Sequence, residues 1–315
     1  MMQDRRIAVV VPCYNEATQI RRVLDTMPAE VDRVYVIDDA SQDDTVRIVR
    51  EYLSKDPRVH LIVHEQNQGV GGSIATGYKQ AVAEGMDVAV VMAGDGQMDP
   101  ADFLAIVAPV LDGGYDYAKG NRLFSGEAWE MIPRVRYLGN AMLSLLTKIA
   151  SGYWHIADSQ SGYTAIGQRA LEAIDWDQMY KRYGQPNDLL VRLNVAEMRV
   201  TDVPIRPVYG IGEKSGIRPL RMIPRLSWLI IRLFFYRMLH KYVIQDFHPL
   251  LFFYVLGILL FPPGFLFGFY LVVFRIFIGT IAETSALFAV FLTIMGLQFL
   301  LFAMLFDLEN NRHLK

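Results

Sequence analysis

The sequence predicts an α/β domain built on a mostly parallel sheet with flanking helices, followed by interfacial helices and two transmembrane helices. Short runs rich in β-branched residues alternate with amphipathic stretches from residue 6 to about 119, as strands and helices do in a parallel sheet. A basic, aromatic segment follows residue 213, and two long uncharged runs come after it. The 315 residues are enough to bury a sizeable core.

The strands are expected at the four apolar runs RIAVVVP, DRVYVID, RVHLIVH and DVAVVMA. Helices are expected at 16–27, 43–54, 71–84 and 133–150. Ligands of such sheets bind beyond the carboxyl ends of the strands. The loops PCYNE, DDASQDDT, EQNQGVGG and AGDGQMDP are therefore expected to form one site, with segment 120–213 supplying that of a second substrate.

The charges are unevenly distributed. With 31 basic and 33 acidic residues, the net charge of -2 argues against nucleic acid as a partner. No acidic residue lies between Glu213 and Asp246, where basic and aromatic residues share one helical face, which indicates helices at a membrane interface. Pro219 and Pro224 predict two short helices there rather than one. The arginines of this face are Arg218, Arg221, Arg225 and Arg232.

The uncharged runs 249–274 and 284–306 contain 26 and 23 residues, and roughly 20 helical residues cross a bilayer. Their length and aromatic content disfavour two buried core helices. Pro262 and Pro263 are expected to kink or partly unwind the first run. The linker 275–283 is short, so the pair is predicted to form a hairpin, and the basic residues place both chain ends in the cytosol.

These features predict four parts: a catalytic domain at 1–213, juxtamembrane helices at 214–248, a transmembrane hairpin at 249–306 and a cytosolic tail at 307–315. The N-terminal segment has no signal-peptide core, and the single cysteine, Cys13, cannot form an internal disulfide. Both observations agree with a cytosolic catalytic part of an integral membrane protein, in the plasma membrane if the source is prokaryotic.

Acidic and glycine-rich loops follow the first three predicted strands. Glu16, Asp38 and Asp39 would meet at adjacent strand ends, where carboxylates suit ribose hydroxyls and base N–H groups, although such acids also serve as turns or helix caps. The loop NQGVGG resembles a dinucleotide-binding fingerprint, but Ile74 replaces its third glycine and the loop follows the third strand. A chain packed closely beneath a nucleotide explains these glycines better than a nicotinamide or flavin site, and a tight turn without a ligand remains open.

The motifs VVVPCYNEA, VIDDASQDDT, NQGVGGSIATGYKQA, DGQMDP and DSQSGY occur in the order seen in family 2 glycosyltransferases with the Rossmann-like GT-A fold, which the chain resembles. The segment VPIRPVYGIGEKSGI and the two terminal spans resemble the dolichyl-phosphate mannose synthase and polyprenyl-phosphate glycosyltransferase branch. The resemblance covers residues 6–306. It implies a nucleotide-sugar donor, Mg²⁺ or Mn²⁺, and a dolichyl or undecaprenyl phosphate acceptor among membrane lipids. The Q-x-x-R-W motif of processive polysaccharide synthases is absent.

The resemblance also implies roles for individual residues. Asp95 matches the second acid of the D-x-D motif and Gln97 the glutamine that joins it at the metal, while Ala93 stands where the first acid would be. Asp99, four residues on, either contributes or caps a helix. The residues expected to bind the nucleotide-sugar are Pro12, Tyr14, Glu16, Asp38, Asp39, Gly69, Gly71 and Asp95.

Inverting transfer requires that the charge on the leaving diphosphate be stabilised. Mg²⁺ commonly takes only one or two carboxylates with phosphate oxygens and water, so the missing acid is expected to weaken metal binding without abolishing it. A lipid phosphate is already largely ionised and needs cationic guidance rather than a strong base. Arg122, Arg206 and Lys214 are expected to bind it. Asp158 would orient it or act as base, so the expected catalytic residues are Asp95, Asp158 and Arg122.

Two alternatives stay open at this point. A diacylglycerol or ceramide hydroxyl acceptor would need a general base, so activity would collapse in Asp158→Asn or Asp188→Asn and survive loss of Arg122. A lipid phosphate predicts the reverse order. A non-catalytic membrane protein that binds nucleotide-sugars is supported only by Ala93. The sequence leaves the donor open between UDP-glucose and GDP-mannose types, and homo-oligomerisation open as well.

Overall fold

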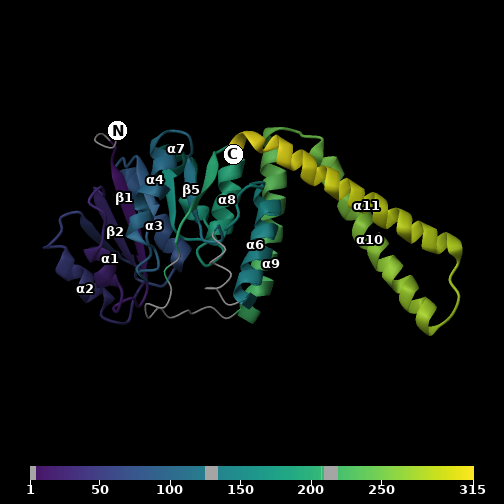
Figure 1. The fold of residues 1–315 in the computed structure, drawn as a ribbon, viewed down its shortest axis with the longest axis horizontal. Helices are drawn as coiled ribbons and strands as arrows, with labels where there is room; N and C mark the ends of the chain where they lie inside the picture. The colour runs from purple at the N-terminus through teal and green to yellow at the C-terminus, as the bar shows by residue number, and fades with distance from the viewer. Residues whose placement is uncertain (1–4, 125–133, 207, 209–218) are drawn as a thin grey trace. The chain divides into compact units, whose positions relative to one another are not determined.

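The computed structural model describes residues 5–124, 134–206, 208 and 219–315. It divides into two compact units (Figure 1). The first comprises Met1–Phe234 together with Leu314–Lys315, and the second comprises Phe235–His313. The domain boundary expected at residue 213 falls outside the described residues.

The first unit is built on a seven-stranded sheet of order β3-β2-β1-β4-β6-β5-β7. Strand β6 pairs antiparallel with both of its neighbours, and the other described pairings are parallel. The sheet confirms the predicted fold class and its four N-terminal strands. The strands are β1 (Ile7–Cys13), β2 (Arg33–Asp38), β3 (Val59–Val63), β4 (Val88–Val91), β5 (Tyr117–Asn121), β6 (Thr164–Gly167) and β7 (Val200–Pro204).

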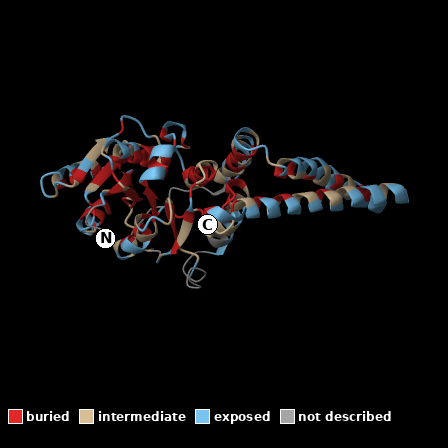
Figure 2. Cartoon of the chain, turned by 90° about the horizontal axis from the view of Figure 1, so that it is seen from above, coloured by how far each residue is buried: buried red, intermediate tan, exposed pale blue. Residues whose placement is uncertain are grey.

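Helices cover both faces of this sheet, and the buried residues concentrate between the layers (Figure 2). Val9 and Val11 of β1 pack toward α1, α2 and α4, while Ala8 and Val10 pack toward α3, α7 and α8. Burial on both faces explains why β1 is a continuous apolar run. The helices of this unit are α1 (Ile20–Asp25), α2 (Thr45–Tyr52), α3 (Val70–Ala83), α4 (Phe103–Leu111), α6 (Arg134–Ser151), α7 (Gln168–Ala173) and α8 (Gln185–Val195), with short 3₁₀ turns η1 (Pro100–Asp102) and η2 (Trp176–Gln178).

The basic segment forms one helix, α9 (Pro219–Leu239), followed by a π-helical turn, η3 (His240–Gln245). The prediction of two short helices was therefore wrong. Pro219 occupies the first helical position, where no backbone N–H is needed. Pro224 removes only a bond to the first turn, so the helix continues past it.

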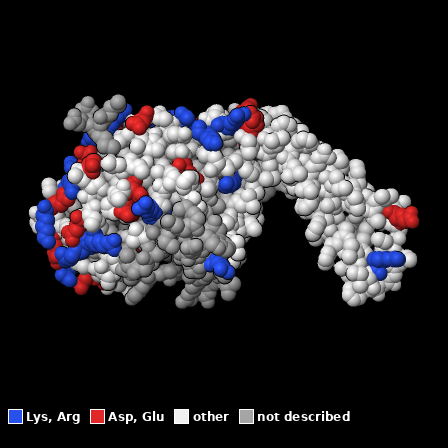
Figure 3. All heavy atoms as spheres, in the orientation of Figure 1, with Lys and Arg blue, Asp and Glu red and all other residues white. Residues whose placement is uncertain are grey.

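The second unit contains α10 (Leu250–Phe277) and α11 (Glu283–Asn310), each 28 residues long. Only 22% and 17% of their most apolar windows are buried, unlike the core helices of a soluble protein. Figure 3 shows charged side chains near the two ends of this pair and almost none between them. At about 1.5 Å per residue each helix is about 42 Å long, and about 30 Å suffices to cross a bilayer. Both helices are compatible with membrane spans.

The contact between α10 and α11 is a seam of small residues. Its small buried residues lie seven positions apart, at Gly257 and Gly264 in α10 and at Ala289, Gly296 and Ala303 in α11. A Cβ atom on Gly296 would lie 2.3 Å from the backbone nitrogen of Phe261, so the two backbones touch beside Pro262 and Pro263. Helix α10 stays helical through both prolines, and the predicted unwinding does not occur. The close support from α11 explains this.

A buried polar cluster lies at the base of this hairpin. Arg237, fully buried at the end of α9, donates two hydrogen bonds of 2.7 and 2.9 Å to the carboxylate of Asp307 in α11. Tyr242 donates to Asp307 at 2.6 Å, and Asn311 donates to it at 3.0 Å. Lys241 donates to the side-chain oxygen of Asn311 at 2.9 Å. These contacts tie α9 and η3 to the end of α11.

Candidate active site

The loops after β1 and β2 are fastened to each other. The backbone N–H groups of Asn15 and Glu16 donate to the hydroxyls of Ser41 and Thr45, both at 2.9 Å. The helix expected at 16–27 is shorter in the structure, where α1 spans Ile20–Asp25 and residues 17–19 form a turn. Pro12 is buried at the end of β1, whereas Tyr14 is 46% exposed above it. Tyr14 is therefore available to a ligand.

Asp38 and Asp39 end β2 and differ in what they bind. The carboxylate of Asp39 accepts hydrogen bonds from the backbone N–H groups of Gln68 and Gly69, at 2.8 and 2.7 Å, and contacts Nδ1 of His64 at 2.8 Å. It therefore holds the loop after β3. Asp38 accepts from the Ser41 N–H at 3.0 Å through Oδ2, while its buried Oδ1 has no hydrogen-bond partner among the described residues.

The glycines after β3 are required by the protein's own backbone. A Cβ on Gly69 would lie 2.5 Å from the Lys181 carbonyl oxygen, and one on Gly71 would lie 2.3 Å from that of Tyr180. Gly69 also has φ of +88°, which disfavours a side chain. The segment 180–185 thus packs on the start of α3, which explains both glycines without a nucleotide beneath them. Asp188, fixed to Arg192 and to the Tyr180 N–H at 2.7 Å, holds this segment in place.

The loop after β4 carries the candidate metal ligands. Asp95 and Gln97 are half-buried, and Asp95 accepts the Gln97 N–H at 3.0 Å. Gly94 lies against Cys13, where a Cβ would be 2.5 Å from the sulfur, so the loop is pressed onto the end of β1. The Asp99 carboxylate accepts the Ala101 N–H at 2.9 Å and so caps η1, one of the two roles expected for it.

The charges around this loop fit a divalent cation. Burial, and then the carboxylates of Asp95 and Asp43, raise the pKa of Glu16 from 4.5 to about 7. No group of three His, Cys, Asp or Glu side chains with metal-ligand geometry occurs in the described part of the chain. Asp95 and the Gln97 side chain would therefore hold Mg²⁺ or Mn²⁺ only together with water and the phosphate oxygens of a bound ligand.

Arg122 and Asp158 are brought together at the end of β5. Arg122 donates to Asp158 through Nε at 2.7 Å and Nη2 at 3.1 Å. Burial alone would raise the pKa of Asp158, but the Arg122 guanidinium outweighs it and keeps this pKa below its ordinary value. Asp158 is therefore a weak base that fixes the direction of Arg122. The exposed Arg206 lies beside η1, its N–H donating to Asp102 at 2.9 Å, and Lys214 lies outside the described residues.

A buried charge cluster behind Arg122 was missed by the sequence reasoning. Lys119 on β5 is fully buried, donates to the carbonyl oxygen of Ser161, and neighbours Asp202 on β7 in register. Burial lowers the pKa of Lys119 from 10.5 to about 8 and raises that of Asp202 from 3.8 to about 6. A lysine inside the apolar strand YAKGN was the available signal. The cluster supports the loop that carries Asp158.

Residues 8–175 match the family model described as Glycosyl transferase family 2. The chain belongs to this glycosyltransferase family. It is 31% identical over 221 residues to UDP-N-acetylglucosamine--dolichyl-phosphate N-acetylglucosaminyltransferase of Methanococcus voltae, which covers 66% of this chain and 88% of that protein. It is also 31% identical over 219 residues to undecaprenyl-phosphate mannosyltransferase of Micrococcus luteus, which covers 67% of this chain and 88% of that protein.

Solved structures share the fold of this glycosyltransferase. Glucosyl-3-phosphoglycerate synthase from Mycobacterium tuberculosis, in complex with Mn²⁺, UDP and phosphoglyceric acid, matches with a TM-score of 0.54 at 21% identity. The match covers 74% of this chain and 78% of that one. The same synthase has been solved with Mg²⁺ and UDP, at a TM-score of 0.52 and 20% identity over 74% of this chain and 79% of that one. That synthase has therefore been solved with UDP and either metal.

Proposed function

We propose that this glycosyltransferase transfers a sugar, with inversion, from a nucleotide-diphosphate-sugar to a membrane polyprenyl phosphate. The two relatives named above are transferases to dolichyl and undecaprenyl phosphate. The observation that carries the proposal is the fixed Arg122 guanidinium beside a carboxylate that is a weak base. This arrangement suits an acceptor that arrives already ionised.

On the acceptor side, the chain must guide an anion rather than remove a proton. Asp158 holds Arg122 in one orientation, and a fixed guanidinium loses little freedom when it binds phosphate. The lowered pKa of Asp158 disfavours a general base for a diacylglycerol or ceramide hydroxyl. Arg206 and Lys214 are proposed to assist with the same phosphate.

On the donor side, the loops after β1, β2 and β4 are proposed to bind the nucleotide-sugar. Tyr14 offers an exposed ring, and the buried Oδ1 of Asp38 can accept a hydrogen bond from a base or ribose. Asp95 and Gln97 would hold the divalent cation, which neutralises charge on the leaving diphosphate.

Membrane attachment is proposed to bring the acceptor to this site. Leu138, Met142 and Leu145 form an exposed apolar stripe on α6, and Trp228 and Ile231 form another on α9. Both helices pack against the start of α8, through Thr147 with Asn187 and through Leu229 with Gly184. Their exposed arginines include Arg134, Arg225 and Arg232. Apolar side chains beside arginines suit the surface of an anionic bilayer, and we propose that both chain ends lie on its cytosolic side.

The test uses full-length protein in detergent, a short polyprenyl phosphate, and labelled UDP- and GDP-sugars with Mg²⁺, Mn²⁺ or EDTA. Label should enter the organic phase from one donor, depend on metal, and be lost in Asp95→Asn. Arg122→Gln should lower kcat/KM for the lipid more than Asp158→Asn, because asparagine can still accept a hydrogen bond from Arg122.

Arg169→Gln is the matched control, because Arg169 forms an exposed ion pair with Asp116 away from β5's end loop. It should transfer sugar at the wild-type rate. Transfer to a lipid hydroxyl that collapses in Asp158→Asn but survives Arg122→Gln would replace the proposal with the hydroxyl acceptor. Binding of nucleotide-sugar without transfer to any acceptor would identify a non-catalytic protein.

A further inference from the structure

We propose that Arg22 binds a phosphate group of a substrate beside the metal site, at the place opened by the missing acid. The inference rests on the proposed function for the identity of the phosphate. It concerns a residue of α1 that no motif of the sequence indicated. It also explains why Ala93 need not mark a lost activity.

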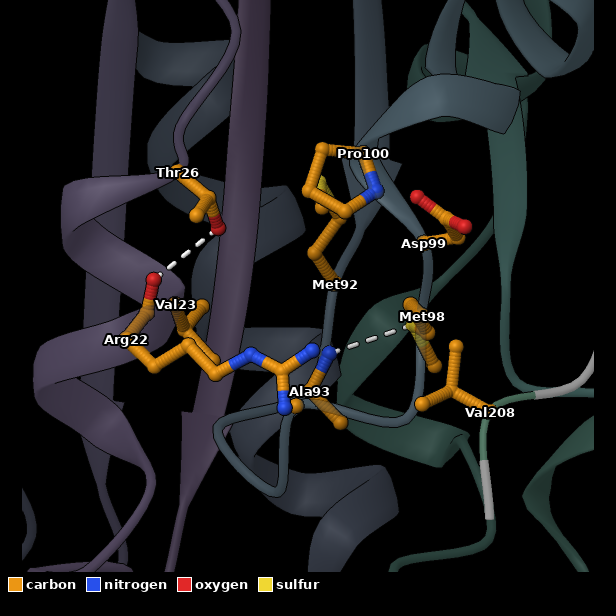
Figure 4. A pocket seen from close by; sticks show the side chains of 10 residues that line it. Arg22, Val23, Thr26, Met92, Ala93, Met98, Asp99, Pro100 and Val208 are labelled. Atoms are coloured by element: carbon orange, nitrogen blue, oxygen red, sulfur yellow. Dashed lines mark hydrogen bonds between the residues drawn. The ribbon is translucent and has the colours of Figure 1, made fainter. Parts of the chain in front are cut away.

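Arg22 and Ala93 line the same cavity, of about 80 Å³, between α1 and the loop after β4. Figure 4 shows the Arg22 side chain extended from α1 with its guanidinium end toward Ala93. Gly96 and Met98 continue the wall, so the cavity lies along the loop that carries Asp95. A guanidinium in this position can reach an anion bound at that loop.

The guanidinium is not used elsewhere in the described part of the chain. Arg21, its neighbour in α1, pairs with Glu51 at 3.0 Å, whereas no ion pair joins Arg22 to any described acid. Asp99 lines the same cavity, but its carboxylate accepts the Ala101 N–H at 2.9 Å. An aspartate at position 93 would face Arg22 and neutralise it. Alanine there leaves the positive charge for a ligand.

The formal charges favour a phosphate as that ligand. Two carboxylate ligands would cancel the charge of a divalent ion. Asp95 alone leaves the ion with a net charge of about +1, which attracts the diphosphate. Arg22 adds one further positive charge, on a fork suited to phosphate oxygens. Compared with an aspartate at position 93, alanine beside Arg22 thus weakens metal affinity and strengthens direct binding of the phosphate. Nucleotide binding should therefore survive metal removal in part.

The experiment measures binding of UDP and GDP to the full-length protein in detergent by calorimetry, in EDTA and in Mg²⁺. Manganese affinity is measured separately by the electron paramagnetic resonance of free Mn²⁺. The variants are Arg22→Gln, Ala93→Asp and both together, and Arg21→Gln is the control on the same helix. Loss of a charge-assisted hydrogen bond predicts a Kd raised about 10-fold in Arg22→Gln, and less than about 2-fold in Arg21→Gln.

Ala93→Asp should tighten Mn²⁺ binding and weaken nucleotide binding in EDTA, because its carboxylate occupies Arg22. Adding Arg22→Gln to it should then weaken nucleotide binding in EDTA by less than it does in the wild-type background. If Arg22→Gln instead raises only the KM for polyprenyl phosphate, the bound phosphate is that of the lipid and the proposal stands. Wild-type behaviour of Arg22→Gln in all these measurements would overturn it.

These measurements test the role of Arg22 separately from the proposed transfer to polyprenyl phosphate. Nucleotide binding requires no acceptor, so it tests Arg22 even if the wild-type protein transfers no sugar to polyprenyl phosphate. Failure of transfer with a clear Arg22 effect would reject the acceptor alone. Normal transfer without any Arg22 effect would reject the role of Arg22 alone.

Discussion

The buried ion pair at the base of the hairpin gives the sharpest prediction for stability. Arg237→Met removes the guanidinium that donates to both carboxylate oxygens of Asp307 and leaves this carboxylate fully buried without its arginine. Removing one partner of such a pair costs about 3–5 kcal/mol. Tyr242 and Asn311 still donate to Asp307, so we expect the lower end, about 3 kcal/mol.

The assay heats the detergent-solubilised protein and measures the fraction that remains folded at each temperature. Arg225→Met is the matched control, because Arg225 lies exposed on the same helix and its replacement should change stability by less than about 0.5 kcal/mol. The double variant Arg237→Met with Asp307→Asn should be more stable than Arg237→Met alone, because it no longer buries a carboxylate that has lost its arginine. Strictly additive losses in the double variant would refute this reasoning.

Three further predictions concern packing and charge. Gly71→Ala should lower stability by about 1–3 kcal/mol, since its Cβ meets the Tyr180 carbonyl oxygen at 2.3 Å, whereas Gly139→Ala on α6 meets nothing within 4 Å and should be neutral or stabilising in the same melting assay. Gly296→Leu should separate α10 from α11 and expose the hairpin to protease. Because the pKa of Asp202 is raised to about 6, its folded form prefers the proton, so stability should fall as pH rises from about 4 to 6, and Asp202→Asn should flatten this melting profile between pH 4 and 7.

The sheet and the place of the site could be predicted from sequence because both follow from local patterns. Apolar runs such as IAVVVPC give strands buried on both faces, and the polar loops after them must meet at one edge. The pairing of Arg122 with Asp158 could not be predicted, because 36 residues separate them and only the fold brings β5 and the DSQSG loop together. The same holds for Arg22 and Ala93.

Contacts with distant segments of the same chain override two rules that hold for isolated sequence segments. The glycines after β3 pack against residues 180–185, more than a hundred positions away, so their spacing alone could not indicate this contact. Proline normally interrupts a helix, yet α10 passes through two prolines because α11 lies directly against it. The residue pattern of one segment cannot reveal which distant segment will pack against it.

The glycine seam of the hairpin also bears on the lipid around the protein. The apolar runs of 26 and 23 residues are about 39 and 35 Å long as helices, against a hydrocarbon layer of about 30 Å. Because the backbones of α10 and α11 touch at Gly264 and Gly296, neither helix can change its tilt independently of the other. In the proposed transmembrane arrangement, the two helices would tilt together or be surrounded by a thicker bilayer. If α10 and α11 span the membrane as proposed, its thickness would then influence where this transferase resides.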